Sequence, residues 1–404
     1  MPSFSISTLG CRANQADSER MAQLLRAAGW VELSADSSVD VALVNTCSIT
    51  AEADHKSRKL LKRRQRLAQL VVATGCSVAE RGGMGEVPAG VCVINPHEQD
   101  TLLERLSEWG YPENLQGEAD VCQHRTRALI RVQDGCNHFC TYCIVPYVRG
   151  RLHSFPIEDL VPQVQRLERE GFKEIVLTGI HLSMWGHETS PQRDMAYLLQ
   201  RFLEATQTVR FRLSSVEPIS FPRSLLQLMR ECPERLCPHL HLPLQHASDA
   251  ILKRMRRDYT LAEYDDLVQE FRQVPGAVLT TDILLGFPGE SEDDMQILLD
   301  YLDKTPYYHL HVFPYSRRPG TAANTYPDQI DERLKKQRVE RVIAFGEVLK
   351  ERVLAQFRGT TRPVLVERLV PGTGLVTGTA DNYISVQFPG DASMLGTIVM
   401  AQVN

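Results

Sequence analysis

Residues 136 to 143 read Cys136-Asn137-His138-Phe139-Cys140-Thr141-Tyr142-Cys143, a C-x3-C-x2-C loop that follows a predicted strand at 128–132. Thiolates at this spacing wrap one iron–sulfur cluster from a single loop. Three thiolates leave one of four irons without a protein ligand, and an open metal position is typical of catalysis. The alternative is zinc, which takes four ligands and would use His138 as the fourth.

Strand and helix patterns alternate on both sides of this loop, from about residue 127 to residue 330. The candidate strands are 128–132, 174–177, 209–213, 239–242, 278–285 and 309–312. The helical patterns between them are 157–170, 195–206, 224–230, 261–273 and 292–302. Six such strands predict an α/β fold with a parallel (β/α) barrel, or most of one, and an active site at the carboxyl ends of the strands.

The first 105 residues predict a smaller α/β domain with a parallel sheet. Apolar runs at 39–45 and 70–74 are typical of buried parallel strands, and residues 18–28 and 52–68 have helical patterns. Three candidate strands each end at a cysteine, namely Cys11, Cys47 and Cys76. Functional groups gather beyond the carboxyl ends of parallel strands, so these thiols are predicted to converge. Taken singly, each of these cysteines is more often a small buried hydrophobic residue than a ligand.

The remaining segments complete a predicted domain order. Residues 107–126 contain turn residues and are expected to be a linker. One charged helix is predicted over 331–357, ended by Gly359. Short β-runs at 364–370, 372–374, 383–388 and 398–403 predict a small C-terminal β-barrel. The expected boundaries are therefore 1–106, the linker 107–126, the barrel 127–357 and the β-module 358–404.

Composition narrows the possible environments and partners. The 404 residues are 43% hydrophobic with a formal charge of −5, so any nucleic-acid contact must come from a local basic patch. No signal sequence and no membrane-spanning apolar run is evident, which predicts a cytoplasmic protein with no membrane partner. Ten cysteines in a reducing compartment favour metal ligands over disulfides. Packing is the expected role for the cysteines outside the two groups, which are Cys92, Cys122, Cys232 and Cys237.

Motifs along nearly the whole chain resemble those of the radical S-adenosylmethionine methylthiotransferase family. Three segments resemble the anchors of its N-terminal domain: Leu9-Gly10-Cys11-Arg12-Ala13-Asn14-Gln15, Asn45-Thr46-Cys47-Ser48-Ile49-Thr50 and Thr74-Gly75-Cys76. The Cys136 loop resembles the radical signature, and residues 144–151, 177–182, 213–218, 239–245, 286–290 and 311–316 continue the pattern in order. The C-terminal β-module resembles a TRAM domain. His246-Ala247-Ser248 departs from the family's usual Ser-Gly-Ser.

The resemblance implies two [4Fe-4S] clusters and S-adenosylmethionine as cofactors. It makes the six cysteines Cys11, Cys47, Cys76, Cys136, Cys140 and Cys143 the catalytic metal ligands. One cluster cleaves S-adenosylmethionine to a 5′-deoxyadenosyl radical, and the other delivers sulfur. The residues expected to bind S-adenosylmethionine are Tyr142, near the adenine, and Gly179, His181, Ser214, Glu217 and Gln245 after barrel strands. An electron donor such as flavodoxin or ferredoxin and a sulfur source are implied partners.

The resemblance also bears on the substrate. Residues 48–58 and 314–320 are closest to the MtaB-type subgroup, which modifies threonylcarbamoyladenosine next to the anticodon of tRNA. Other subgroups act on isopentenyladenosine in tRNA or on a ribosomal-protein aspartate. A non-enzymatic electron carrier is a further alternative, although carriers more often complete each cluster with four protein ligands.

A basic run on the predicted helix 52–68 is the candidate contact to the tRNA anticodon loop. The expected RNA-binding residues are Lys59, Lys62, Arg63 and Arg64, with Lys56, Arg58 and Arg66 beside them. Lysine and arginine side chains bind phosphates, and splayed single-stranded bases suit RNA recognition. A solvated helix face without a partner is the alternative.

Overall fold

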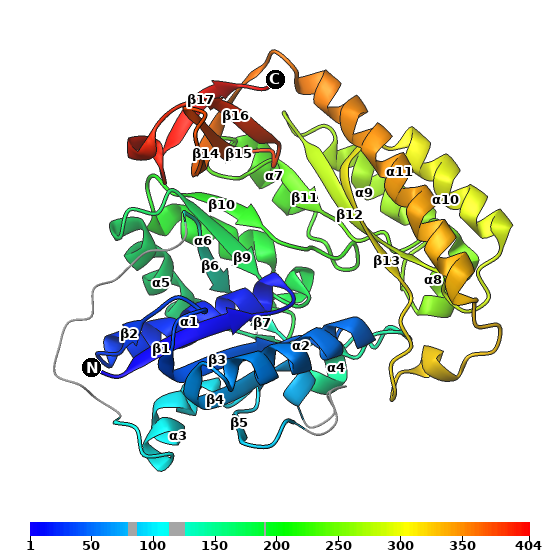
Figure 1. Ribbon diagram of the computed structural model, residues 1–404. Helices are drawn as coiled ribbons and strands as arrows, with labels where there is room; N and C mark the ends of the chain where they lie inside the picture. Colours follow the sequence, from blue (N-terminus) through cyan, green and yellow to red (C-terminus); the bar gives the residue numbers. More distant parts are fainter. Residues whose placement is uncertain (80–86, 113–125, 190) are drawn as a thin grey trace. The chain divides into compact units, whose positions relative to one another are not determined.

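The computed structural model describes residues 1–79, 87–112, 126–189 and 191–404 (Figure 1). The chain divides into two compact units. The first contains residues 1–123, 134–152 and 316–324, and the second contains 124–133, 153–315 and 325–404. The Cys136 loop therefore belongs to the same unit as the N-terminal sheet. Most of the predicted linker, and with it Cys122, lies outside the described residues.

A five-stranded parallel sheet in the order β2-β1-β3-β4-β5 forms the centre of the first unit. Its strands are β1 (Ser3–Thr8), β2 (Val31–Glu32), β3 (Val39–Thr46), β4 (Ala68–Gly75) and β5 (Val91–Val93). Its helices are α1 (Arg12–Ala27), α2 (Ala51–Arg64), α3 (Leu102–Glu108) and α4 (Val145–Val148). The predicted α/β domain with a parallel sheet is confirmed, because buried parallel strands read as continuous apolar runs.

Two helix boundaries in this unit differ from prediction. α1 begins at Arg12, directly after Cys11, rather than at residue 18. α2 ends at Arg64, and Ala68, which was predicted to close the helix, begins β4 opposite Val39. Alanine and glutamine favour helices, but pairing with a neighbouring buried strand overrides this weak local preference.

Six parallel strands form the barrel of the second unit, in two three-stranded sheets ordered β6-β9-β10 and β11-β12-β13. They are β6 (Ala128–Arg131), β9 (Glu174–Thr178), β10 (Arg210–Leu213), β11 (His239–His241), β12 (Val278–Leu285) and β13 (Tyr307–Pro314). Isolated bridges between Phe211 and Leu236 and between Ser215 and His241 join the two sheets. The six predicted strands are confirmed. The short strands β7 (Gln133–Asp134) and β8 (His153–Ser154) were not predicted.

Helices pack their apolar faces on these strands and form the main core. They are α5 (Ile157–Arg169), α6 (Met195–Ala205), α7 (Ser224–Glu231), α8 (Asp249–Met255), α9 (Leu261–Phe271), α10 (Glu292–Lys304) and α11 (Glu332–Phe357). Capping boxes at Thr260 and Ser291 fix the starts of α9 and α10. Only α8 was not predicted. Its seven residues are too few for a clear helical periodicity.

A curled antiparallel sheet in the order β16-β15-β14-β17 forms the C-terminal module. Its strands are β14 (Thr361–Val370), β15 (Leu375–Ala380), β16 (Ser385–Pro389) and β17 (Ile398–Gln402). The predicted β-run at 372–374 is wrong, because these residues form the turn between β14 and β15. β15 was not predicted, since its glycine and threonines resemble a turn segment.

A buried ion network joins this module to the barrel within the second unit. The Glu174 carboxylate, fully buried on β9, pairs with Arg210 Nη2 and Arg212 Nε, each at 2.7 Å. Arg212 also donates to the carbonyls of Ala380 and Asp381, both at 2.9 Å, in the turn after β15. Burial alone would raise the pKa of Glu174, but the neighbouring arginines hold it well below its usual range.

Replacing Glu174→Gln is expected to destabilise the protein by about 3–5 kcal/mol, because buried guanidinium groups lose their counter-charge. Urea unfolding measures the change. Glu170→Gln is the control, since the Glu170 side chain is 40% exposed and its i,i+4 pair with Arg166 contributes at most about 0.5 kcal/mol. Equal losses from both variants would contradict the role given to the network.

Candidate iron–sulfur and cofactor sites

Three cysteines of the first unit lie at the carboxyl ends of three adjacent strands. Cys11 comes shortly after β1 and is the N-cap residue of α1, Cys47 follows β3, and Cys76 follows β4. Cys47 and Cys76 are each 5% exposed. The thiols of Cys76 and Cys11 are near enough to Cys47 to raise its pKa. The predicted grouping of these thiols is therefore present in the fold.

Glycines at positive φ allow the strand ends to approach so closely. Gly10 has a φ of +99°, and a Cβ atom there would lie 2.8 Å from Cys47 Sγ. Gly75 has a φ of +91°, and its Cβ would lie 2.4 Å from Asn45 Oδ1 and from Thr46 O. Both positions therefore require glycine on backbone and on packing grounds.

Side-chain amides and hydroxyls hold the cysteine-bearing turns in place. Asn14 Nδ2 donates to Leu9 O at 2.7 Å and to Thr46 O at 2.9 Å, which ties the Cys11 turn to the Cys47 turn. Asn45 Nδ2 donates in return to Asn14 O at 2.8 Å. Ser57 Oγ of α2 accepts from Cys47 N at 3.2 Å. Such outer contacts orient ligands before a metal binds.

The pKa values of Cys47 and Cys76 are raised, which favours their neutral thiol forms in the protein alone. Burial raises the pKa of Cys47 to about 12, a hydrogen bond with the Ile49 backbone lowers it, and the neighbouring thiols raise it. Burial also raises the pKa of Cys76, whereas the Arg149 guanidinium lowers it. A bound metal reverses this balance, because coordination deprotonates a thiol outright.

The C-x3-C-x2-C segment forms a closed loop in the first unit. Cys136 N donates to Gly150 O at 3.1 Å, so the start of the segment meets the chain just after α4. Inside the loop Cys143 N donates to Cys140 O at 3.0 Å, and His138 N lies 3.4 Å from Cys136 Sγ. Phe139 adopts a φ of +51°, which turns the chain between the first two cysteines. The three sulfurs are thus presented by one compact turn.

Arg149, which follows this loop, is fully buried and contacts the N-terminal cysteine group. Its Nε lies 3.4 Å from Cys76 Sγ, its Nη2 pairs with Asp17 Oδ2 at 2.9 Å, and its Nη1 pairs with Asp134 Oδ1 at 3.1 Å. Ile144 and Val148 of the same segment pack against Cys76. The residues that carry both cysteine groups are therefore joined by direct contacts within one unit.

The donor set fits clusters better than a single ion. Among the described residues, no three His, Cys, Asp or Glu side chains meet closely enough to hold one metal ion, which counts against zinc on Cys136, Cys140, Cys143 and His138. A cluster needs each thiolate on a different iron, so its ligands stand farther apart. None of the nine described cysteines forms a disulfide. Thiolates are the protein ligands that an iron–sulfur cluster takes, so the chemistry of both groups of cysteines fits such a cluster.

The predicted S-adenosylmethionine residues of the second unit lie after the barrel strands. The backbone N–H groups of Ile180 and His181 both donate to Gln133 Oε1, at 2.9 and 2.7 Å. A Cβ at Gly179 would lie 2.9 Å from the same oxygen, so the glycine admits the Gln133 side chain. Ser214 is 4% exposed, and its hydroxyl has no hydrogen-bond partner among the described residues. An unsatisfied buried hydroxyl at this end of the barrel fits a polar cofactor.

Two further predicted residues have protein partners. Glu217 Oε2 pairs with Arg257, and the Glu217 carbonyl accepts from Ser183 Oγ at 2.6 Å. Gln245 has a φ of +62°, and its backbone bonds to Asp282 and Leu284 of β12. These contacts fix both residues at the strand ends without assigning them a ligand. Tyr142 belongs to the first unit, in the cysteine loop.

His246, where the chain departs from the family pattern, has a structural role. It is fully buried, its Nδ1 accepts from Ser248 N at 3.0 Å, and burial lowers its pKa to about 4. A neutral imidazole with a bonded ring nitrogen shapes the turn that the family builds with small residues.

Sequence reasoning missed four polar residues that organise these sites. They are Gln133, Arg149, Arg257 and Arg318. Arg318 donates to Ser48 Oγ at 2.7 Å and pairs with Asp54 next to the Cys47 turn. Apart from Asp134, which is 15 residues from Arg149, the partners named here lie 40 to 270 residues away in the sequence. A local pattern carries no signal for such pairs.

The basic helix α2 is only partly as predicted. Lys59, Lys62 and Arg63 are exposed, and Arg63 pairs with Asp36 Oδ1 at 2.8 Å. Arg64 is 5% exposed, and its guanidinium donates to Ser7 Oγ at 3.0 Å and to Ala35 O. The prediction that Arg64 contacts RNA is therefore wrong, because its charged group is used inside the fold.

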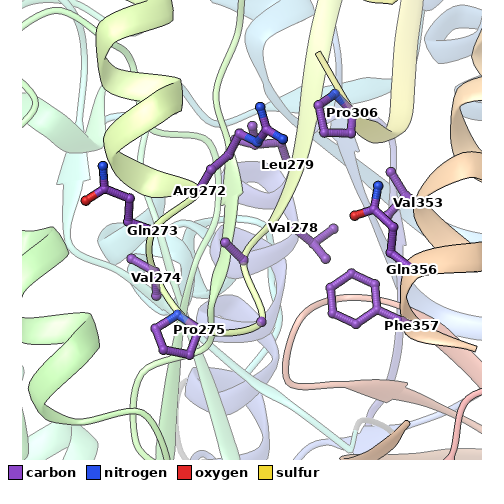
Figure 2. Close-up of a pocket in the computed structure, with 12 residues that line it drawn as sticks. Arg272, Gln273, Val274, Pro275, Val278, Leu279, Pro306, Val353, Gln356 and Phe357 are labelled. Atoms are coloured by element: carbon purple, nitrogen blue, oxygen red, sulfur yellow. The ribbon is translucent and has the colours of Figure 1, made fainter. Parts of the chain in front are cut away.

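A separate cavity of about 380 Å³ lies at the opposite end of the barrel strands (Figure 2). It is bordered by the segment between α9 and β12, by Pro306 before β13, and by Val353, Gln356 and Phe357 at the end of α11. Active sites of such barrels form at the carboxyl ends of the strands. We therefore do not assign the cofactor to this cavity.

Comparison with known proteins agrees with these sites. Residues 130–302 match the Radical SAM superfamily, and residues 3–85 match Uncharacterized protein family UPF0004. The threonylcarbamoyladenosine tRNA methylthiotransferase MtaB of Bacillus subtilis (strain 168) is 31% identical, covering 100% of this chain and 94% of that protein. The protein of the same name from Aquifex aeolicus (strain VF5) is 33% identical, covering 96% of each chain.

A relative with a different substrate is equally similar. The tRNA-2-methylthio-N(6)-dimethylallyladenosine synthase of Pelotomaculum thermopropionicum is 34% identical, covering 100% of this chain and 95% of that protein. Among solved structures, the radical S-adenosylmethionine methyltransferase TsrM from Kitasatospora setae, with cobalamin and a [4Fe-4S] cluster bound, superposes with a TM-score of 0.57. That match has 14% identity and covers 98% of this chain and 83% of that chain, which shows the fold alone.

The chain belongs to the radical S-adenosylmethionine methylthiotransferase family and is an enzyme of that class. The family implies a [4Fe-4S] cluster and S-adenosylmethionine as cofactors. The predicted fold class is also confirmed by its parallel sheets and its curled C-terminal sheet. Among the helices of the described residues, none has the length and apolar character to cross a bilayer.

Gly75→Ala is expected to lower the iron content of the anaerobically reconstituted protein to about half, because a Cβ at this position displaces the Cys76 turn. Colorimetric iron analysis measures the loss. Gly372→Ala is the matched control, since Gly372 also has a positive φ but has no atom within 4 Å of the added Cβ. An unchanged iron content in Gly75→Ala would contradict the proposed ligand role of Cys76.

Proposed function

We propose that the enzyme is a tRNA methylthiotransferase that converts N6-threonylcarbamoyladenosine next to the anticodon into its 2-methylthio derivative. We also propose a second [4Fe-4S] cluster on Cys11, Cys47 and Cys76, beside the radical cluster on Cys136, Cys140 and Cys143. When bound, these clusters and S-adenosylmethionine supply the radical, the inserted sulfur and the methyl group. The boundaries 1–106, 107–126, 127–357 and 358–404 remain our proposed domains for this reaction.

One contact favours the threonylcarbamoyladenosine subgroup. The two segments whose sequence is closest to that subgroup are 48–58 and 314–320, and residues 316–320 of the second segment bond to the first segment within the first unit. Arg318 contacts Ser48 Oγ and Asp54, and Ala51 N donates to Ser316 Oγ at 3.2 Å. Segments that depend on each other structurally act as one feature, so their joint match is a stronger indication than either alone. Two relatives named for threonylcarbamoyladenosine support the same choice.

The chain's own residues have distinct tasks in this proposal. The six cysteines ligate iron, and the buried positions of Cys47 and Cys76 exclude water from one cluster. Gln133 orders the Gly179–His181 turn, where S-adenosylmethionine is expected to bind together with Ser214, Glu217 and Gln245 of the same unit. Exposed lysines of α2 contact tRNA phosphates. An external reductant, such as flavodoxin or ferredoxin, and a sulfur donor complete the reaction in the cytoplasm.

Mass spectrometry of tRNA nucleosides tests the substrate. The gene is expressed in cells that lack both tRNA methylthiotransferases, with a variant carrying Cys136→Ala, Cys140→Ala and Cys143→Ala as the control. We expect 2-methylthio-threonylcarbamoyladenosine only with the unmodified gene. Detection of the isopentenyl product would overturn the proposed subgroup but would still support a tRNA methylthiotransferase. Neither product, with intact clusters, would favour the ribosomal-protein aspartate instead.

The double variant Lys59→Gln/Lys62→Gln is expected to weaken tRNA binding and to lower the slope of log K against log salt by about 1.4, as for two lost phosphate contacts on a single strand. Filter binding across a salt series measures this slope. Lys336→Gln on α11 is the control, since the Lys336 side chain is 78% exposed and pairs with Glu340. An unchanged slope would show that α2 is merely a solvated face.

A further inference from the structure

The Arg149 guanidinium contacts Cys76 of the N-terminal cysteine group and Asp134, which lies two residues before Cys136. Its side chain is fully buried, as is that of Asp17, one of its two carboxylate partners. The other partner, Asp134, is 10% exposed and also accepts from Gly135 N at 2.9 Å, at the start of the Cys136 loop. The two carboxylates together carry more charge than the guanidinium they neutralise. Arg149 therefore needs no further partner to balance its charge.

The remaining nitrogen of the guanidinium is directed at sulfur. Arg149 Nε lies 3.4 Å from Cys76 Sγ, whereas Nη1 and Nη2 are used by oxygens of Asp134, Asp17 and Asn14. Because the guanidinium is planar, the directions of its N–H groups are fixed relative to one another. The bonds of Nη1 and Nη2 to Asp134, Asp17 and Asn14 therefore also fix the direction of the Nε–H group toward Cys76. A lysine keeps the charge but cannot reproduce this fork.

An N–H donor on a cluster thiolate changes the redox chemistry of the cluster. A hydrogen bond to a cluster sulfur stabilises the reduced, more negative state and raises the reduction potential. Burial strengthens this hydrogen bond because the local dielectric is low, whereas the positive charge itself is offset by Asp17 and Asp134. The same side chain holds Asp134, so it also fixes the Cys136 loop relative to Cys76.

We propose that Arg149 is a positioning residue that donates its Nε–H to Cys76 Sγ, raises the reduction potential of the Cys11–Cys47–Cys76 cluster and holds that cluster in register with the radical loop. This inference rests on the proposed second cluster. A purely structural ion pair would not perform this role, and neither would another positively charged side chain at position 149.

The test uses the full chain with Cys136→Ala, Cys140→Ala and Cys143→Ala, so that only the N-terminal cluster remains. Its midpoint potential is measured by EPR-monitored redox titration with Arg149 intact and with Arg149→Lys. We expect Arg149→Lys to lower the equilibrium constant for reduction about tenfold, which is about 59 mV for one electron. Iron content is measured in parallel.

Arg64→Lys is the matched control. Arg64 is also buried in the first unit, at 5% exposure, but it donates to the oxygens of Ser7 and Ala35. We expect it to lose stability without a shift in potential. Equal potentials in Arg149→Lys and Arg64→Lys would overturn the inference. Failure of any cluster to assemble with Arg149 intact would instead overturn the proposed second cluster itself.

A second readout applies if Arg149→Lys does not fold. The triple-cysteine variant with Arg149 intact is enriched in ¹⁵N-arginine, and the reduced cluster is examined by pulsed ENDOR. We expect a ¹⁵N coupling from the N–H···S contact. The absence of any arginine nitrogen coupling would overturn the inference.

Discussion

The buried charge of Arg149 is the interaction on which the metal-binding unit depends. It is balanced by Asp17 of α1, which is 132 residues away in the sequence, and by Asp134 at the entrance of the Cys136 loop. Removing one partner of such a network costs about 3–5 kcal/mol, a large part of the stability of a typical domain. The loop that carries the radical signature is therefore held against the N-terminal sheet by charge, and not only by the covalent chain.

The parallel sheet supplies the second constraint. Adjacent strands β1, β3 and β4 end at one edge, and each is followed by a turn that carries a cysteine. Gly10 and Gly75 let these turns approach, and Asn14 and Asn45 bond them together. In the second unit the same rule gathers Gly179, Ser214 and Gln245 at strand ends. Both candidate sites thus follow from where parallel strands terminate.

Much of this was predictable from sequence, and the exceptions have physical causes. The six barrel strands read as apolar runs, and the three dispersed cysteines could be grouped because each follows such a run. The ends of α2 could not be placed, because strand pairing at Ala68 outweighs local propensity. Arg64 was assigned to RNA binding because all the basic residues of the predicted helix 52–68 were treated alike. Its spacing from Ser57 and Leu61, both buried, places it on the inward helical face. Arg149, Gln133 and Arg318 act through distant partners that no local pattern reveals.

The central claim is that this chain carries two separate three-cysteine clusters. Iron and EPR analysis of three anaerobically reconstituted proteins tests it most directly: the unmodified chain, the Cys11/Cys47/Cys76→Ala variant and the Cys136/Cys140/Cys143→Ala variant. Our account predicts about eight irons in the first and about four in each variant, with two distinct EPR signals that sum to the first. Full loss of iron in either variant, or four irons in the unmodified chain, would contradict it.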